Sequence, residues 1–349
     1  MVYIKLAIIA LVIIVGAFYV DIDNWTPFMP NGFSGVMGGV SAVFFAYIGF
    51  DAVSTLAEES KNPQRDLPKG MIYSLVICTI VFIILALVIT GMVSYELLGV
   101  SDPLAEIFAL KGVKWMLFVV SIAAVVAMTS VLLVFQMGQP RIWMTMSRDG
   151  LMPKRFSRIH PKYKTPSFAT LVTGLVVGIP IFFTDENFVL DFTSIGTLFA
   201  FVLVCGGVLM LSPQSEAEIA ERETKGKFRI PYVNSKFIFP AIMVVAVALI
   251  LRYVPDFFTN VFDFSTGEKL ATNIPMLVFL IVCIVMTFVS FTKNLSLIPL
   301  LGLISCCYLL TGMAVSNWMW FGVWLVIGLI IYFTFSYKNS KLNTEVEKK

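Results

Sequence analysis

The chain has 349 residues, of which 58% are hydrophobic and 13% are charged, and its mean hydropathy is +0.89. Soluble domains are about one quarter charged, so this composition excludes a soluble core and indicates a polytopic membrane protein. The five cysteines lie in apolar stretches without paired metal-type spacing, and the single histidine, His160, lies in a basic loop. We therefore expect no metal site and no cofactor.

Apolar stretches long enough to cross a bilayer recur along the whole chain. A crossing helix needs about 20 mostly apolar residues. The expected spans are 3–20, 34–58, 70–93, 114–137, 167–184, 189–211, 237–254, 273–291, 296–313 and 318–336. They predict an all-α polytopic membrane protein with about ten transmembrane helices. The stretch 94–113 predicts a short outer helix, 140–166 a cytoplasmic surface helix, and 212–236 a solvated linker.

The basic residues are distributed unevenly between the two sides. Of the 25 Lys and Arg residues, 20 fall in one set of loops and 4 in the other, and Lys5 lies within the first span. Loops rich in Lys and Arg face the cytoplasm. We therefore expect a multi-pass protein of the cell (plasma) membrane with both termini, including a tail at 337–349, in the cytoplasm.

The stretch 33–68, FSGVMGGVSAVFFAYIGFDAVSTLAEESKNPQRDLP, holds the most informative residues. It begins as an apolar span with small residues at spacings of three and four, which permit close helix packing. It then places a carboxylate, Asp51, at membrane depth, where a charge usually marks a functional site. Gly49 offers a place for the helix to unwind, so we interpret Phe44 to Asp51 as a break facing a cavity.

Four stretches carry a family resemblance: NWTPFMPNGFSG (24–35), FFAYIGFDAVSTLAEESKNPQRDLPKG (44–70), MGQPRIWMTMSRDGLMPKRFSRIHPKYKTP (137–166) and FTSIGTLFAFVLV (192–204). With these the chain resembles the amino acid–polyamine–organocation (APC) superfamily of secondary transporters. The cationic amino acid transporter branch and its bacterial homologues look most similar.

The resemblance implies a five-plus-five inverted repeat in a single membrane domain, 1–349. In that scheme 3–20 is the last helix of the first repeat, and 34–211 is the second repeat with its broken helix at 34–58. Four additional helices would occupy 237–336. The first four helices of the family are absent from this sequence, so the fold is expected to be partial, with the missing N-terminal helices as a possible partner.

The resemblance also implies a substrate site at the break. Main-chain carbonyls of Phe45, Ala46 and Ile48 would receive the ammonium of an amino acid near Gly49, which suits groups that a broken helix leaves unsatisfied. Phe45 would close over the substrate. Asp51 would read a basic side chain or act in gating; the alternative is a capping or interhelical hydrogen bond with Ser54 or Thr55, which are close in the sequence.

Three further residues enter the expected site. The resemblance places Lys5 where proton-coupled members carry a lysine in place of a sodium ion, and burial of an amine favours its neutral form. The alternative is that Lys5 lies near the cytoplasmic part of its span and extends to the head groups. Thr129 and Ser130 lie mid-span, where they would line the cavity or make interhelical hydrogen bonds.

These features predict proton-coupled secondary transport of zwitterionic or cationic amino acids, and no enzyme activity. The expected partners are the amino acid, protons and membrane lipids, and nucleic acid is not among them. An intramembrane aspartyl protease would need a second carboxylate in a facing helix, and Asp191 is the only other candidate beside Asp51. The remaining alternative is a non-transporting remnant or the partner subunit of a split permease.

Overall fold

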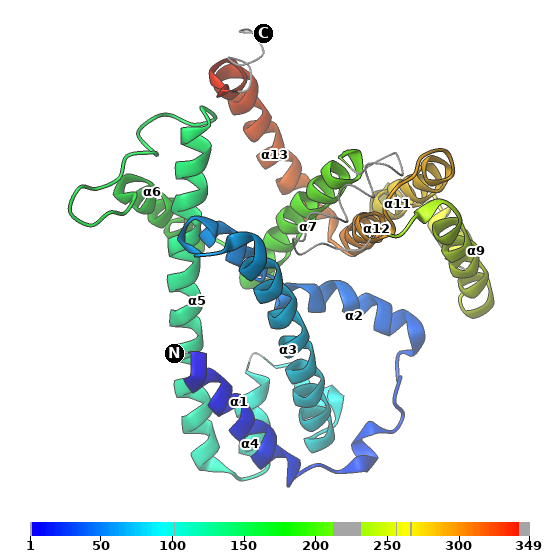
Figure 1. Cartoon of the computed structure of the whole chain (residues 1–349). Coiled ribbons are helices and arrows are strands. Elements are labelled where there is room, and N and C mark those ends of the chain that lie inside the picture. Colours follow the sequence, from blue (N-terminus) through cyan, green and yellow to red (C-terminus); the bar gives the residue numbers. More distant parts are fainter. Residues whose placement is uncertain (1, 101, 212–231, 256, 266, 342–349) are drawn as a thin grey trace. The chain divides into compact units, whose positions relative to one another are not determined.

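The structure, a computed structural model, describes residues 2–100, 102–211, 232–255, 257–265 and 267–341 (Figure 1). Its regular elements are all helical, and one isolated bridge joins Asn234 to Ser296. Seven described helices are long and apolar enough to cross a membrane, and three shorter apolar helices accompany them. The prediction of an all-α polytopic membrane protein is confirmed. Residues 212–231 of the expected linker and 342–349 of the expected tail lie outside the described residues.

The contacts divide the described chain into two compact units. The first comprises the described parts of Met1–Val36, Gly49–Phe182 and Ile331–Lys349, and the second those of Met37–Ile48 and Phe183–Ile330. One passage of the chain between the units thus falls inside the stretch interpreted as a broken helix.

The elements of the first unit are α1 (Val2–Ala17), η1 (Ile22–Trp25), the start of α2 (Gly32–Tyr47), η2 (Asp51–Glu59), α3 (Pro63–Met92), η3 (Tyr95–Leu98), α4 (Pro103–Leu110), α5 (Lys114–Arg148), α6 (Ser167–Gly178), η4 (Pro180–Phe182), the π-helical turn η5 (Tyr332–Ser336) and α14 (Tyr337–Asn339). The elements of the second unit are the rest of α2, α7 (Glu186–Met210), α9 (Ser235–Tyr253), α10 (Phe257–Val261), α11 (Gly267–Thr292), α12 (Leu297–Thr311) and α13 (Val315–Ile331).

The core of the first unit lies where α1, α3 and α4 meet the N-terminal half of α5. Val12, Met92, Phe108, Met116 and Val120 are all at most 5% exposed there. Figure 1 shows α1 and α4 beside this half of α5. Burial of such large apolar side chains fixes which helices pack together at this end of the unit.

Helix α4 is the short helix expected in the stretch 94–113. Pro103 occupies its first turn, where a missing N–H costs nothing, and the Asp102 carboxylate accepts a hydrogen bond from Ala105 N at 3.3 Å. The turn signals therefore predict where the helix begins. Its inward side carries Ile107 and Phe108 into the core.

Helix α5 differs from the prediction because it runs to Arg148, well beyond the expected end of its span at residue 137. The separate surface helix expected within 140–166 does not form, since the first part of this stretch continues α5. Apolar side chains of this extension pack against the following loop. The rings of Trp143 and Phe156 make an edge-to-face contact with their centroids 5.4 Å apart. This packing stabilises the continuation of α5, although the polar and basic composition of the stretch had suggested a separate surface helix.

The C-terminal segment contacts the turn that follows α5. Ser336 is 4% exposed and its hydroxyl donates to Leu151 O at 2.6 Å. A second hydrogen bond runs from Lys341 N to Asp149 O at 3.1 Å. Residues more than 180 positions apart are therefore joined by hydrogen bonds to main-chain carbonyls of this turn.

The second unit has two apolar clusters. In one, Ile195 and Leu198 of α7 pack against Leu310 of α12 and Phe321 of α13. In the other, Phe239 of α9 is fully buried with neighbours from α7 and α12. A buried hydroxyl pair, Ser235 and Ser290 at 2.8 Å, joins α9 to α11, and Asn317 Nδ2 donates to Asp191 Oδ2 at 2.7 Å. Such polar pairs are typical of helix contacts within a membrane.

Candidate functional site

The apolar stretch 35–55 is interrupted in its middle. Helix α2 ends at Tyr47, the 3₁₀ helix η2 begins at Asp51, and Gly49 between them has φ +119°. This backbone conformation is strained for any residue with a Cβ, so glycine is what allows the chain to break here. The interruption falls within Phe44–Asp51, the stretch singled out in the sequence.

The interruption changes the hydrogen bonding of the main-chain groups at the end of α2. The carbonyls of the last four residues of a helix have no intrahelical donor. Of these, Phe45 O accepts a hydrogen bond from Ile48 N at 3.1 Å, a tight 3₁₀-type closure. Ala46 is exposed and Ile48 is half-buried. A carbonyl has two lone pairs, so even Phe45 O retains the capacity to accept from a bound cation.

Adjacent phenylalanines at the end of α2 lie in different surroundings. Phe44 packs against the apolar cluster of the second unit, with its ring 6.4 Å from that of Phe201 in an edge-to-face arrangement. Phe45 is 38% exposed. Phe44 therefore anchors the helix end, whereas the side chain of Phe45 is left partly exposed.

Asp51 turns back onto the interruption. Its carboxylate accepts a hydrogen bond from Gly49 N at 3.2 Å, and its main-chain carbonyl accepts one from the Ser54 hydroxyl at 2.6 Å. The side chain is half-buried. This geometry matches a capping role more closely than a bond to the side chain of Ser54 or Thr55, and it leaves one carboxylate oxygen beside the break.

Two polar residues expected along the cavity occupy the middle of α5. The Thr129 hydroxyl donates to Val125 O of its own helix at 2.8 Å, and Thr129 is exposed. Ser130 is half-buried. The structure thus gives Thr129 an intrahelical bond rather than an interhelical one.

Lys5 lines a cavity of about 230 Å³ formed by α1, α3, the start of α4 and α5. Val12 shares the core with Val120, and Lys5 lies two turns earlier on α1, facing the alanine-rich part of α5. Ala123 and Ala127 lie about 14–20 Å along α5 from its first residue, Lys114. Lys5 lies in the first turn of α1, and the cavity places it beside these alanines.

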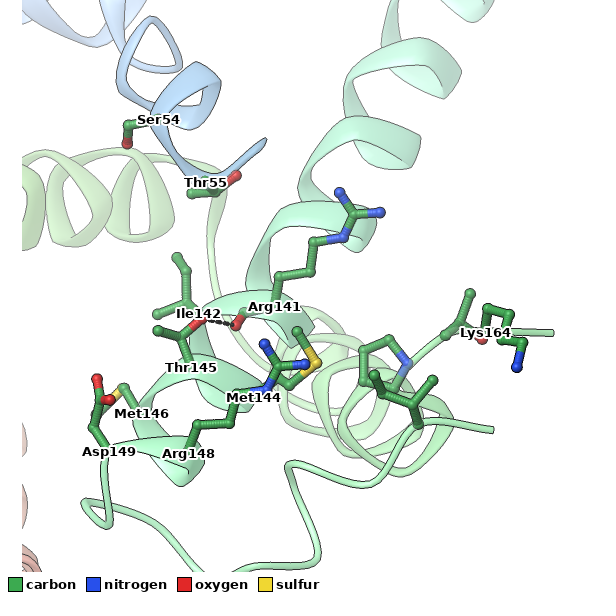
Figure 2. A pocket seen from close by; sticks show the side chains of 13 residues that line it. Ser54, Thr55, Arg141, Ile142, Met144, Thr145, Met146, Arg148, Asp149 and Lys164 are labelled. Carbon is green, nitrogen blue, oxygen red and sulfur yellow. Dashed lines mark hydrogen bonds between the residues drawn. The ribbon is translucent and has the colours of Figure 1, made fainter. Parts of the chain in front are cut away.

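A larger cavity of about 600 Å³ lies at the basic end of α5 (Figure 2). Arg141 and Arg148 come from α5, Thr55 comes from η2, and Lys164 comes from the loop that returns toward α6. Figure 2 shows both arginines extending from the same helix, with Thr145 between them. From the sequence, these basic residues contributed to the orientation and to the family resemblance of 137–166, and they were not among the expected site residues. Their spacing of seven on one helix was the signal for a shared face.

Comparisons with known proteins place these features in a family. The family model described as "Amino acid permease" matches residues 1–281. The chain is 34% identical over 344 residues to the branched-chain amino acid permease BcaP of Bacillus subtilis (strain 168), covering 98% of this chain and 59% of the relative. It is 33% identical over 341 residues to the methylthioribose transporter of the same organism, covering 97% and 59%.

A plant relative matches a shorter part more closely. Cationic amino acid transporter 9, chloroplastic, of Arabidopsis thaliana is 43% identical over 222 residues, covering 63% of this chain and 39% of the relative. The chain spans about three-fifths of the length of the two bacterial relatives. A match over most of the chain is nevertheless enough to assign the family, which is one of transporters and not of enzymes. The protein is a multi-pass membrane protein of the amino acid permease family.

Proposed function

We propose that this chain supplies the greater part of a secondary transporter for amino acids. The observation that carries the proposal is the interruption at Ile48–Phe50 inside an apolar span, with Gly49 at φ +119°. Unwound backbone at membrane depth is tolerated where it lines a cavity, and discontinuous helices form the substrate sites of many transporters. Membership of the amino acid permease family supports the same assignment.

The interruption has the chemistry to bind an ammonium group. Carbonyls at the C-terminal end of α2 carry partial negative charge, and an ammonium can donate up to three hydrogen bonds. Phe45, Ala46 and Ile48 would provide acceptors around Gly49, and the exposed ring of Phe45 would cover the bound group. Cation–π attraction at that ring would add to the binding.

The substrate is a zwitterionic or cationic amino acid in this proposal. Asp51 supports the cationic form, because its second carboxylate oxygen lies next to the break. The relatives' names include branched-chain amino acids, cationic amino acids and methylthioribose. The Asp51 carboxylate is the residue most suited to distinguishing a basic side chain from an apolar one.

Lys5 is the proposed coupling residue. Within the described part of the chain it has no hydrogen-bond or ion-pair partner, although it belongs to an apolar helix and lines a mostly apolar cavity. Ionisable residues inside a membrane are costly and usually functional. Gain of a proton would make Lys5 an ammonium, and loss would return the neutral amine, so its charge could follow the transport cycle. Thr129 and Ser130, just beyond on α5, would line the same region.

The proposed location is the cell membrane, with the basic loops and both termini in the cytoplasm. Because the chain covers 59% of its bacterial relatives, we propose that transport also requires helices that those relatives have in addition. The coverage equally favours a second candidate, in which the chain is a non-transporting remnant or the partner subunit of a split permease.

Uptake by proteoliposomes separates these candidates. The chain would be reconstituted alone and together with a fragment carrying the expected first four helices of BcaP, and uptake of labelled leucine, alanine and lysine would be measured under an inward proton gradient. The proposal expects uptake only with the fragment. Uptake by residues 1–349 alone would show that no further helices are needed. Absence of uptake in both samples would favour the candidate in which the chain is a non-transporting remnant.

The same assay tests the two charged residues. Asp51→Asn should reduce lysine uptake more than alanine uptake, whereas Asp66→Asn, an exposed carboxylate at the start of α3, should leave both unchanged. Equal losses of uptake for both substrates would assign Asp51 to gating instead.

Lys5→Ala should abolish proton-driven accumulation while exchange of substrate persists. An unchanged pH profile would remove Lys5 from coupling.

A further inference from the structure

The cavity beside Lys5 extends toward the end of the unit where α4 begins. Its lining follows one face of α1 from Lys5 to Val12 and one face of α5 from Val120 to Ala127. Seven residues of helix span about 10 Å, so the cavity is an elongated crevice that runs along α1 and α5. Asp102, in the loop before α4, lines it together with Leu104.

Two ionisable side chains share an otherwise apolar lining. Among the described residues around the crevice, Lys5 on α1 and Asp102 before α4 are the only charged or titratable ones, since α3 contributes Leu85 and α5 contributes Val120 and alanines. Asp102 is exposed, and one of its oxygens caps α4 through Ala105 N. The crevice therefore has an exposed carboxylate where α4 begins and a half-buried amine in the first turn of α1.

Small side chains on α5 provide the space between these groups. Ala123, Ala124 and Ala127 lie at helical spacing on the side that faces α1. A volume of about 230 Å³ has room for about seven waters at their share of liquid volume. The carboxylate and the amine supply polar partners at the two ends of such a chain of waters. Larger residues at the alanine positions would fill the crevice.

We propose that this crevice is the route by which protons from outside the membrane reach Lys5, with Asp102 as the acceptor at its mouth. The inference rests on the proposed coupling role of Lys5 and on the proposed orientation. Asp102 takes a proton from hydronium at the surface and passes it through water to the neutral Lys5 amine. Asp102 returns to a carboxylate and Lys5 becomes an ammonium, so the proton is conserved at each step.

The test is the access of thiol reagents, which requires no transport. Ala124→Cys would be placed in the crevice, and Val125→Cys, at the same depth but 65% exposed on another side of α5, is the matched control. Membrane-impermeant cationic and anionic methanethiosulfonate reagents would be applied to the outer face of vesicles, with the native chain as the blank. We expect labelling at position 124 and none above the blank at position 125.

The charge of Asp102 gives the second readout. The cationic reagent should label position 124 faster than the anionic one. Asp102→Asn should reduce the ratio of the two rates severalfold, because it removes an attraction for the cationic reagent and a repulsion for the anionic one. Asparagine still caps α4, so the variant is expected to fold. Equal labelling at 124 and 125, labelling from the inner face alone, or a preference unchanged by Asp102→Asn would each overturn the proposal.

Transport then separates this inference from the proposed function. In the complemented proteoliposomes, Asp102→Asn should slow proton-driven uptake while leaving substrate exchange intact. If labelling succeeds and Lys5→Ala has a normal pH profile, the crevice is aqueous but coupling lies elsewhere, and the proton route is rejected. If Lys5→Ala abolishes coupling and position 124 is not labelled, Lys5 couples through another path.

Discussion

The two ends of α5 are held by different kinds of contact. At its N-terminal end, Met116 and Val120 are buried among apolar side chains of α1, α3 and α4. At its basic end, Ser147 donates to Pro153 O at 2.8 Å, and the following turn accepts hydrogen bonds from the C-terminal segment. One helix thus has an end held by apolar packing and an end where hydrogen bonds to main-chain carbonyls add to the packing. The first should be sensitive to cavities, and the second to backbone strain and lost hydrogen bonds.

The largest effect is expected at the packed end. Phe108→Ala removes a side chain that is 1% exposed at the centre of the α1–α3–α4–α5 core, and a cavity of that kind costs about 3–5 kcal/mol. The apparent Tm in detergent should fall accordingly. Phe118→Ala is the control, since Phe118 is 70% exposed. Equal decreases in the apparent Tm of the two variants would show that α4 does not anchor α5.

The next effect is expected at the basic end. Gly150 has φ +84°, and a Cβ there would overlap the carbonyl oxygen of Asn339. Gly150→Ala should cost about 1–3 kcal/mol through backbone strain and should also release the C-terminal segment. Gly99→Ala is the control, because that site has open space and negative φ. Protease cleavage after residue 331 would report release, and unchanged cleavage would contradict this contact.

A smaller effect tests the hydrogen bond alone. Ser336→Ala leaves Leu151 O without the hydroxyl that now donates to it at 2.6 Å, and should cost about 1 kcal/mol. The matched control is Ser157→Ala, whose hydroxyl bonds locally to Lys154 O on the surface. Hydrogen exchange at residues 149–151 should accelerate in the first variant only. Identical exchange in both would show that the backbone contact is enough.

The smallest net effect is expected where η2 meets α5. A Cβ on Gly138 would lie 3.2 Å from Thr55 Oγ1, so crowding should offset the helix-propensity gain of about 1 kcal/mol from Gly138→Ala. Adding Thr55→Ala removes the crowding. A double-mutant cycle of the two Tm changes should then give a favourable coupling above about 0.5 kcal/mol. Additive changes would mean that the two residues are not in contact.

The sequence by itself determined the class and much of the local structure. Apolar length predicts each membrane helix separately, because every buried backbone group must be satisfied within its own helix. Local signals also sufficed for a short helix within 94–113, which forms as α4, and for an interruption near Gly49, where only glycine adopts φ +119° without strain.

Only the tertiary structure decided how these pieces meet. The direction of the Asp51 carboxylate toward Gly49 N, the continuation of α5 to Arg148, and the contact of Ser336 with Leu151 all depend on partners that periodicity does not specify. Lys5 is the clearest case. Hydropathy placed it near the end of a span, but the packing of Val12 against the α5 core decides that it lies beside Ala123 and Ala127, because a helix is positioned by complementary side chains from distant parts of the chain.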